Sequence, residues 1–191
     1  MAYAYRSKIY LAEVALLVKD LDRQTAFYTQ MLGLEMLSQT EEEVLLGAGG
    51  KPLVHLIQTD RTEAVQASYG LYHMAILLPS REDLADVFKH IAELNYPFVG
   101  AADHGYSEAL YLEDPEGNGI ELYRDKPVAD WDIRGDGRII GVTEELSAQE
   151  IYDMGRKVEP FQIAPDTRMG HIHLSVRDSQ VASAFYQKVL E

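Results

Sequence analysis

The sequence has no cysteine, few cations and no long apolar run, and each absence narrows the classes of function. The lack of cysteine among 191 residues excludes disulfides, thiolate metal sites and a cysteine nucleophile. Lysine and arginine number 17 against 31 acidic residues, so the formal net charge is −14, which argues against nucleic acid and anionic membranes as partners. No apolar stretch approaches the roughly 20 residues of a membrane span, and the N-terminal MAYAYRSKIY has no signal-peptide core. We therefore expect a cytoplasmic protein.

What the sequence does contain is one pattern written three times. The three copies are Leu11–Leu34, Tyr72–Leu94 and Gly170–Glu191. Each reads as a short apolar strand, a polar residue able to cap a helix, and an amphipathic helix. A metal-capable side chain opens each strand, seven positions before the capping residue: Glu13, His73 and His171. Repetition at this scale identifies a structural unit, and a polar group fixed in each unit predicts a site.

Further strands follow the first two copies and complete two βαβββ modules, at residues 9–60 and 70–125. In the first module, Asp20 or Asp22 can cap the helix. The strands expected after the two helices are Glu35–Thr40, Glu43–Leu46, Pro52–Gln58, Pro97–Ala101, Ser107–Glu113 and Gly119–Tyr123. The segment Asp114–Gly117 has proline second and glycine fourth, which is typical of a type I turn. The pattern predicts an α+β fold of two paired modules.

The remaining chain is less regular. Residues 126–168 have weak periodicity and predict a linker, with one candidate helix at Ser147–Arg156. Residues 169–191 open a third module that stops after its helix. An isolated strand and helix leave a sheet edge and an apolar helix face uncovered. We therefore expect a natural chain that continues beyond Glu191, with docking on another surface as the alternative, and self-association into a homo-oligomer.

Strand alternation decides which way the polar groups point. In the first strand, larger branched residues at alternate positions suit packing against the helix of the module: Val14, Leu16 and Val18. Glu13 then faces the opposite, concave side of the sheet, and the same parity holds for His73. Applied to the last strand of each module, this parity completes a set of four polar side chains on one concave surface: Glu13, His55, His73 and Glu121.

Two imidazoles and two carboxylates on one surface suggest a metal site. A half-buried carboxylate on an apolar strand is costly unless something compensates it, and a divalent cation would do so. The set suits Fe²⁺, Mn²⁺, Ni²⁺ or Zn²⁺, with one or two positions left for water or substrate. The alternative is a degenerate module whose polar residues only line a cleft.

Two longer motifs carry a resemblance to a known family: EVALLVKDLDRQTAFYTQMLGLE and DHGYSEALYLEDPEGNGIELY. They resemble the vicinal oxygen chelate superfamily, which includes glyoxalase I, extradiol ring-cleaving dioxygenases, fosfomycin-resistance enzymes and bleomycin-binding proteins. The resemblance implies that the paired modules form a cupped mixed sheet that binds a divalent metal through the four residues above. Glu13 stands where active members usually have histidine or glutamine, and His55 stands where glyoxalases often have glutamate.

The second motif is most similar to the extradiol dioxygenase signature, and this similarity implies residue roles. His104 would be the acid/base that shuttles a proton, and Tyr111 would hydrogen-bond a substrate oxygen. Fe²⁺ would be the metal, and a small aromatic diol of the catechol type would be the substrate. The chain is most similar to the two-domain catechol 2,3-dioxygenase-like proteins of Gram-positive bacteria. There the third module opens a second domain, so His171 would be an iron ligand with its partners beyond Glu191.

Two other functions stay open at this point. A glyoxalase-like lyase or isomerase would use the same metal with one glutamate as base. It would also need a cationic clamp for glutathione, and the sequence shows no convincing one. A non-catalytic module that sequesters a hydrophobic small molecule, with or without metal, is the other alternative.

Overall fold

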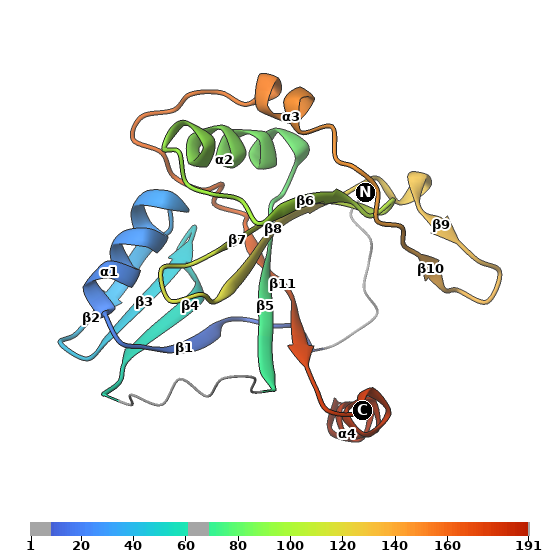
Figure 1. The fold of residues 1–191 in the computed structure, drawn as a ribbon, viewed down its shortest axis with the longest axis horizontal. Helices are drawn as coiled ribbons and strands as arrows, with labels where there is room; N and C mark the ends of the chain where they lie inside the picture. Colours follow the sequence, from blue (N-terminus) through green and yellow to red (C-terminus); the bar gives the residue numbers. More distant parts are fainter. Residues whose placement is uncertain (1–8, 61–68, 191) are drawn as a thin grey trace.

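Two mixed β-sheets form the protein, which a computed structural model describes over residues 9–60 and 69–190. The first sheet has the strand order β1-β4-β3-β2, and the second has the order β11-β5-β8-β7-β6 (Figure 1). In each module the first strand pairs in parallel with the last strand, and the remaining pairs are antiparallel. The α+β fold of two βαβββ modules that the sequence predicts is confirmed.

The first module has the predicted order of strands and helix, although β1 begins one residue after Glu13. Its elements are β1 (Val14–Val18), α1 (Leu21–Ala26), the wider turn η1 (Phe27–Met31), β2 (Glu35–Gln39), β3 (Glu43–Ala48) and β4 (Lys51–Gln58). The carboxylate of Asp20 accepts the backbone N–H of Arg23 at 2.9 Å, which is the expected helix cap. Gly33 has φ +69°, a left-handed conformation that suits glycine and turns the chain from the helix into β2.

The second module repeats this order with a longer helix. Its elements are β5 (Gly70–Leu77), α2 (Arg81–Glu93), β6 (Gly100–Asp103), β7 (Ser107–Glu113) and β8 (Gly119–Asp125). The hydroxyl of Ser80 accepts the backbone N–H of Asp83 at 3.1 Å and caps α2. Between β7 and β8, the N–H of Gly117 donates to the carbonyl of Asp114 at 2.9 Å, as the type I turn signature predicts.

The helices α1 and α2 pack on the sheets, and the apolar core lies between these helices and the strands (Figure 1). Because alternate strand residues face one side, the buried positions of β1 are Leu16 and Val18, on the face expected to pack against the helix. A single apolar cluster includes residues of both modules, among them Tyr28, Leu56, Met74, Ile76, Leu84 and Leu110. The opposite face of the second sheet carries a smaller apolar cluster, Ala75, Leu77, Ala109 and Tyr123, together with polar side chains such as Glu121.

Residues 126–168, expected as a linker, pack against the second module. They contain η2 (Val128–Asp130), β9 (Asp132–Ile133), β10 (Ile139–Ile140) and α3 (Ala148–Met154), the last within the expected helix. The backbone N–H of Arg156, just after α3, donates to Asp86 of α2 at 2.7 Å, and Ile151 of α3 is buried. This segment therefore covers α2 and one end of the second sheet.

The third copy of the pattern forms β11 (Arg168–Ser175) and α4 (Ser179–Leu190). β11 pairs antiparallel with β5 and becomes the edge strand of the second sheet. α4 lies apart from both sheets and buries none of its side chains (Figure 1). Within residues 9–60 and 69–190, no helix has the length and apolarity needed to cross a membrane.

Candidate metal centre

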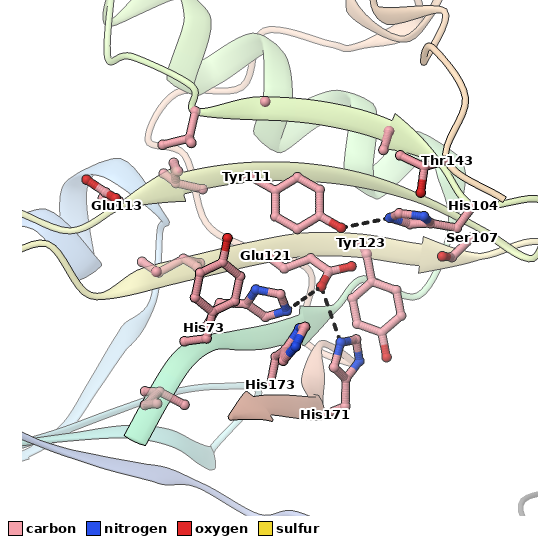
Figure 2. A pocket seen from close by; sticks show the side chains of 18 of the residues that line it. His73, His104, Ser107, Tyr111, Glu113, Glu121, Tyr123, Thr143, His171 and His173 are labelled. Carbon is pink, nitrogen blue, oxygen red and sulfur yellow. Dashed lines mark hydrogen bonds and ion pairs between the residues drawn. The ribbon is translucent and has the colours of Figure 1, made fainter. Parts of the chain in front are cut away.

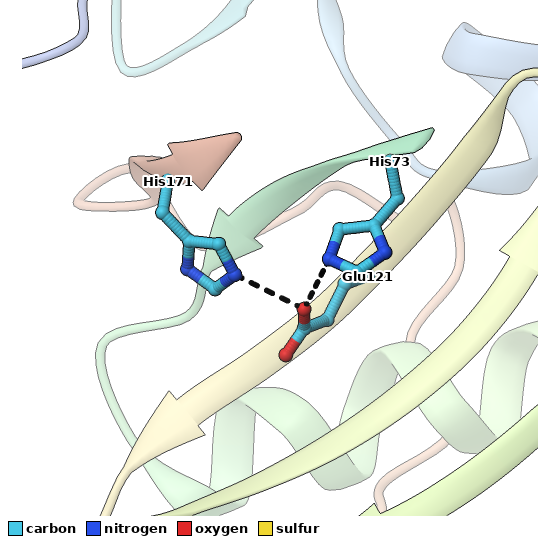
Figure 3. Close-up of side chains that lie close together, drawn as sticks. All are labelled: His73, Glu121 and His171. Atoms are coloured by element: carbon cyan, nitrogen blue, oxygen red, sulfur yellow. Dashed lines mark ion pairs between the residues drawn. The ribbon is translucent and has the colours of Figure 1, made fainter. Parts of the chain in front are cut away.

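Three side chains from three strands of the second sheet meet at one point: His73, Glu121 and His171 (Figure 3). Nε2 of His73 lies 3.0 Å from Oε2 of Glu121, and Nε2 of His171 lies 3.2 Å from the same oxygen. One possible ligand atom from each residue lies within 4.8 Å of the others. Within the described part of the chain, this is the one such group of three histidine or acidic residues, and we call it the triad.

The register of the sheet explains why the triad forms. Tyr111 of β7 lies opposite Glu121 of β8, which lies opposite Ala75 of β5, which in turn lies opposite His171 of β11. Side chains that face each other across a ladder point to the same side of the sheet. His73 precedes Ala75 by two positions and shares that side. The methyl group of Ala75 leaves space between Glu121 and His171, so the three longer side chains can converge above it.

The triad fits a divalent cation. The side chains of His73 and Glu121 are buried, at 7% and 4% exposure. Although Nε2 of His73 is close to Glu121, it has no partner with hydrogen-bond geometry. A buried nitrogen without a hydrogen bond is costly, and a metal ion would satisfy its lone pair. Two imidazoles and one carboxylate with the opposite side open are the donor set typical of non-haem ferrous sites.

The charge state of Glu121 also suits a ligand. Burial raises the pKa of this carboxyl, but its contacts with His171 and His73 outweigh burial and hold the pKa at about 2. Glu121 is therefore ionised at neutral pH, which coordination requires.

The structure brings together only part of the four-residue set expected from the sequence. His73 and Glu121 belong to the triad, but Glu13 and His55 do not. Glu13 is exposed just before β1, and His55 of β4 lies 3.1 Å from Glu43 of β3, so both are in or beside the first sheet.

The third member of the triad is His171, for which sequence reasoning expected partners beyond the end of the chain. Its partners Glu121 and His73 instead lie in the second module. The signal that could have found it was the repeat itself. His73 and His171 stand at the same place in two copies of one pattern, seven residues before the cap.

The triad opens onto a pocket of about 1100 Å³ on the concave side of the second sheet (Figure 2). Aromatic side chains line much of it: Tyr72, Tyr106, Tyr111, Tyr123 and Trp131. His173 also lines the pocket and packs on His73 at 4.9 Å between ring centroids, but it is outside the triad. A pocket of this size and character suits a small aromatic ligand.

Tyr111 lies next to His73, with 5.7 Å between the ring centroids, and His104 lies on the far side of Tyr111 (Figure 2). Nε2 of His104 is 2.8 Å from the Tyr111 hydroxyl, and Nδ1 is 2.9 Å from the carbonyl oxygen of Val142. Because a carbonyl only accepts, Nδ1 carries a proton, and Nε2 of the neutral ring accepts the proton of Tyr111. Burial and then the charge of Glu121 raise the pKa of Tyr111, so it is a protonated donor. The two residues expected to be catalytic thus form one hydrogen-bonded pair beside the triad.

The fold and this site define a class of protein. The sequence profile of the Glyoxalase/Bleomycin resistance protein/Dioxygenase superfamily matches residues 10–122, and the chain belongs to this superfamily.

Individual relatives extend the comparison. The chain is 35% identical over 178 residues to the catechol-2,3-dioxygenase of Bacillus subtilis (strain 168), covering 92% of this chain and 62% of that protein. It is 29% identical over 129 residues to biphenyl-2,3-diol 1,2-dioxygenase 3 of Rhodococcus globerulus, covering 60% of this chain and 63% of that protein. The chain therefore spans about three fifths of the length of both curated relatives. The crystal structure of the cppA protein from Streptococcus pneumoniae TIGR4 shares the fold, with a TM-score of 0.52, 16% identity, and coverage of 86% of this chain and 59% of that one.

Proposed function

We propose that this chain is a metal-dependent extradiol dioxygenase, which opens the ring of a catechol-like diol beside its hydroxyl groups. The observation that carries the proposal is the triad of His73, Glu121 and His171, open to an aromatic-lined pocket and faced by the His104–Tyr111 pair. The names of two relatives, a catechol dioxygenase and a biphenyl-diol dioxygenase, support it. Fe²⁺ is the proposed ion, with Mn²⁺, Ni²⁺ and Zn²⁺ as alternatives that the same donors accept.

The triad residues would hold the ion, and its chemistry would be to lower the pKa of the diol and to orient the diol beside dioxygen. The other side chains of the pocket then have definable tasks. Tyr111 holds its proton firmly, and once a diol is bound its hydroxyl would turn from His104 to donate to a diol oxygen next to Glu121. Nε2 of His104 would then be released from Tyr111 and would be the acceptor of that ring, because Nδ1 donates to the Val142 carbonyl. We assign it the proton that leaves the second hydroxyl of the diol and returns to the opened product.

A reconstitution experiment tests the proposal. The protein is loaded with Fe²⁺ under anaerobic conditions, mixed with catechol, and then exposed to oxygen. We expect uptake of one dioxygen per catechol and a coloured ring-opened product. His171→Ala should lose both signals, whereas His55→Ala, a histidine outside the triad, should keep them.

Other outcomes identify the alternative functions. Tight metal binding without oxygen uptake for any diol would indicate a small-molecule-binding module. Isomerisation of a glutathione adduct under the same conditions would indicate a glyoxalase-like enzyme.

Self-association and a cytoplasmic location stay predictions. Exposed apolar side chains on α4, among them Val181, Phe185 and Val189, support self-association because such surface is usually covered. Light scattering of the purified protein measures its oligomeric state directly.

A further inference from the structure

The charge of the pocket lining carries an inference about which substrates the pocket accepts. Among the described residues that line it, none is lysine or arginine, and three are acidic. Glu121 belongs to the triad, and a bound metal ion would neutralise its charge. Glu113, exposed at the rim, and Asp125 also line the pocket and have no such role.

These two carboxylates stand at opposite ends of the pocket. In the ladder between β7 and β8, Glu113 lies opposite Gly119 at one end and Asp125 lies opposite Ser107 at the other. Figure 2 shows Glu113 and Ser107 at the two ends of β7. Six residue steps of a strand span roughly 20 Å. Tyr111 and Glu121 pair between them, so a diol held at the triad has one acidic group on either side.

The two arginines that act on Asp125 are not part of the pocket lining. Burial is the largest influence on the pKa of Asp125 and leaves it raised, although Arg168, His171 and Arg124 all act to lower it. Nε of Arg124 donates to Glu108 at 2.7 Å, on the other face of the sheet, and neither arginine lines the pocket. A bound anion would therefore meet no lysine or arginine among the described residues of the lining.

We propose that the pocket selects catechols whose ring substituent is neutral or cationic, and that it rejects those whose substituent is a carboxylate. This inference rests on the proposed dioxygenase function. With the hydroxyls held at the triad, a substituent that extends toward either end approaches Glu113 or Asp125. An anion placed there loses its hydration and gains repulsion, whereas an ammonium gains attraction from the carboxylates and from aromatic faces such as Tyr106 and Trp131. The same charge pattern disfavours glutathione adducts, which carry carboxylates.

Three catechols of matched length test the proposal: 4-propylcatechol, dopamine and 3-(3,4-dihydroxyphenyl)propionate. We expect kcat/KM for the propionate to be at least about tenfold below that for 4-propylcatechol, with dopamine equal to or above the neutral compound. The ratio should shrink as salt is raised, because screening weakens interactions between charges. Equal values for the propionate and 4-propylcatechol at low salt would overturn the proposal.

Two substitutions separate the local effect from the overall net charge of −14. Glu113→Gln and Asp125→Asn should each raise the relative kcat/KM for the propionate severalfold, and the double variant should raise it further. Glu41→Gln removes the same charge from an exposed bend outside the pocket and should leave the ratio unchanged. A ratio that shifts equally in Glu41→Gln would assign the effect to net charge and overturn the proposal.

A binding measurement keeps this test independent of turnover. Trp131 is the single tryptophan of the sequence and lines the pocket, so quenching of its fluorescence reports occupancy. Titrations under anaerobic conditions with the Fe²⁺-loaded protein should give an affinity for the propionate about tenfold or more below that for 4-propylcatechol. Turnover of none of the three would contradict the dioxygenase function, while this titration would still decide the charge selection.

Discussion

The hydroxyl of Tyr28 donates a hydrogen bond of 3.0 Å to the carboxylate of Asp114, 86 positions further along the chain. Tyr28 belongs to η1 of the first module, and Asp114 begins the turn between β7 and β8 of the second. Both side chains are buried. Burial and then the charge of Asp114 raise the pKa of Tyr28, so the hydroxyl remains a donor. This buried bond thus joins the helix of one module to a turn of the other, where the backbone N–H groups of Lys19 and Asp20 also donate to the carboxylate of Glu116.

Removing this bond should destabilise the whole protein. Tyr28→Phe leaves the buried Asp114 carboxylate with one donor fewer, and we expect a loss of about 1–3 kcal/mol in the free energy of unfolding. Urea denaturation followed by circular dichroism measures it. Tyr96→Phe is the matched control, because the Tyr96 hydroxyl donates to the carbonyl of Glu113 at an exposed place and should cost less than about 1 kcal/mol. Equal losses of unfolding free energy in both variants would show that the buried bond contributes no more to stability than the exposed one.

Metal affinity distinguishes the triad from the set of four expected from the sequence. His73→Ala and His171→Ala each remove one ligand of three. Loss of a residue that only hydrogen-bonds to a ligand weakens metal binding by up to about 100-fold, so loss of a ligand itself should weaken binding of Fe²⁺ by more than that. Glu13→Ala and His55→Ala should bind as the unaltered protein does. Calorimetric titration under anaerobic conditions measures all four. Full affinity in His171→Ala would show that β11 contributes no ligand to the metal site.

The acid/base role of His104 has its own kinetic signature. His104→Ala should lower kcat on catechol by about 10² to 10⁴-fold, the range for loss of a general acid/base. The metal content of the variant should match that of the unaltered protein, since His104 is outside the triad. Tyr111→Phe should cause a smaller loss, because one hydrogen bond to the substrate is removed and the base remains. An unchanged kcat in His104→Ala would show that this histidine has no acid/base role in turnover.

The lowered pKa of Glu121 predicts an acid dependence of stability in the metal-free protein. Its pKa in the folded state is about 2, below its ordinary value of 4.5. The stabilisation from its ionised form is therefore complete above pH 4.5 and is lost as the pH falls toward 2. Urea unfolding in the presence of a chelator, measured at several pH values, should show a steeper fall in this window than Glu121→Gln shows. Parallel curves for the two proteins would contradict the coupling of Glu121 to His73 and His171.

Much of the fold follows from local sequence signals. The caps at Asp20 and Ser80 and the turn at Asp114–Gly117 occur where the pattern places them, because each depends on residues only a few positions apart. The strand β7, Ser107–Glu113, has the predicted bounds. The packing of residues 126–168 was not predictable in the same way. Its buried side chains, such as Trp131 and Ile163, are scattered between turns and give no periodic signal.

The site was only partly predictable, for a different reason. Alternation along a strand correctly gives the face of His73 and Glu121, because it is a property of one strand. It carries no information about which strands become neighbours. The repeat marked Glu13, His73 and His171 as equivalent positions, and only the pairing of β11 with β5 selects His171 as the partner of Glu121.

Because β11 is the edge strand of the sheet, binding of an ion at the triad would also affect how firmly this strand is held. If an ion is held jointly by β5, β8 and β11, then whatever free energy its coordination contributes also resists peeling of the last strand from the sheet. Reciprocity requires that fraying of this strand weaken retention of the ion by the same factor. Chelation should therefore speed amide hydrogen exchange along residues 168–175 before it affects the central ladders of the sheet.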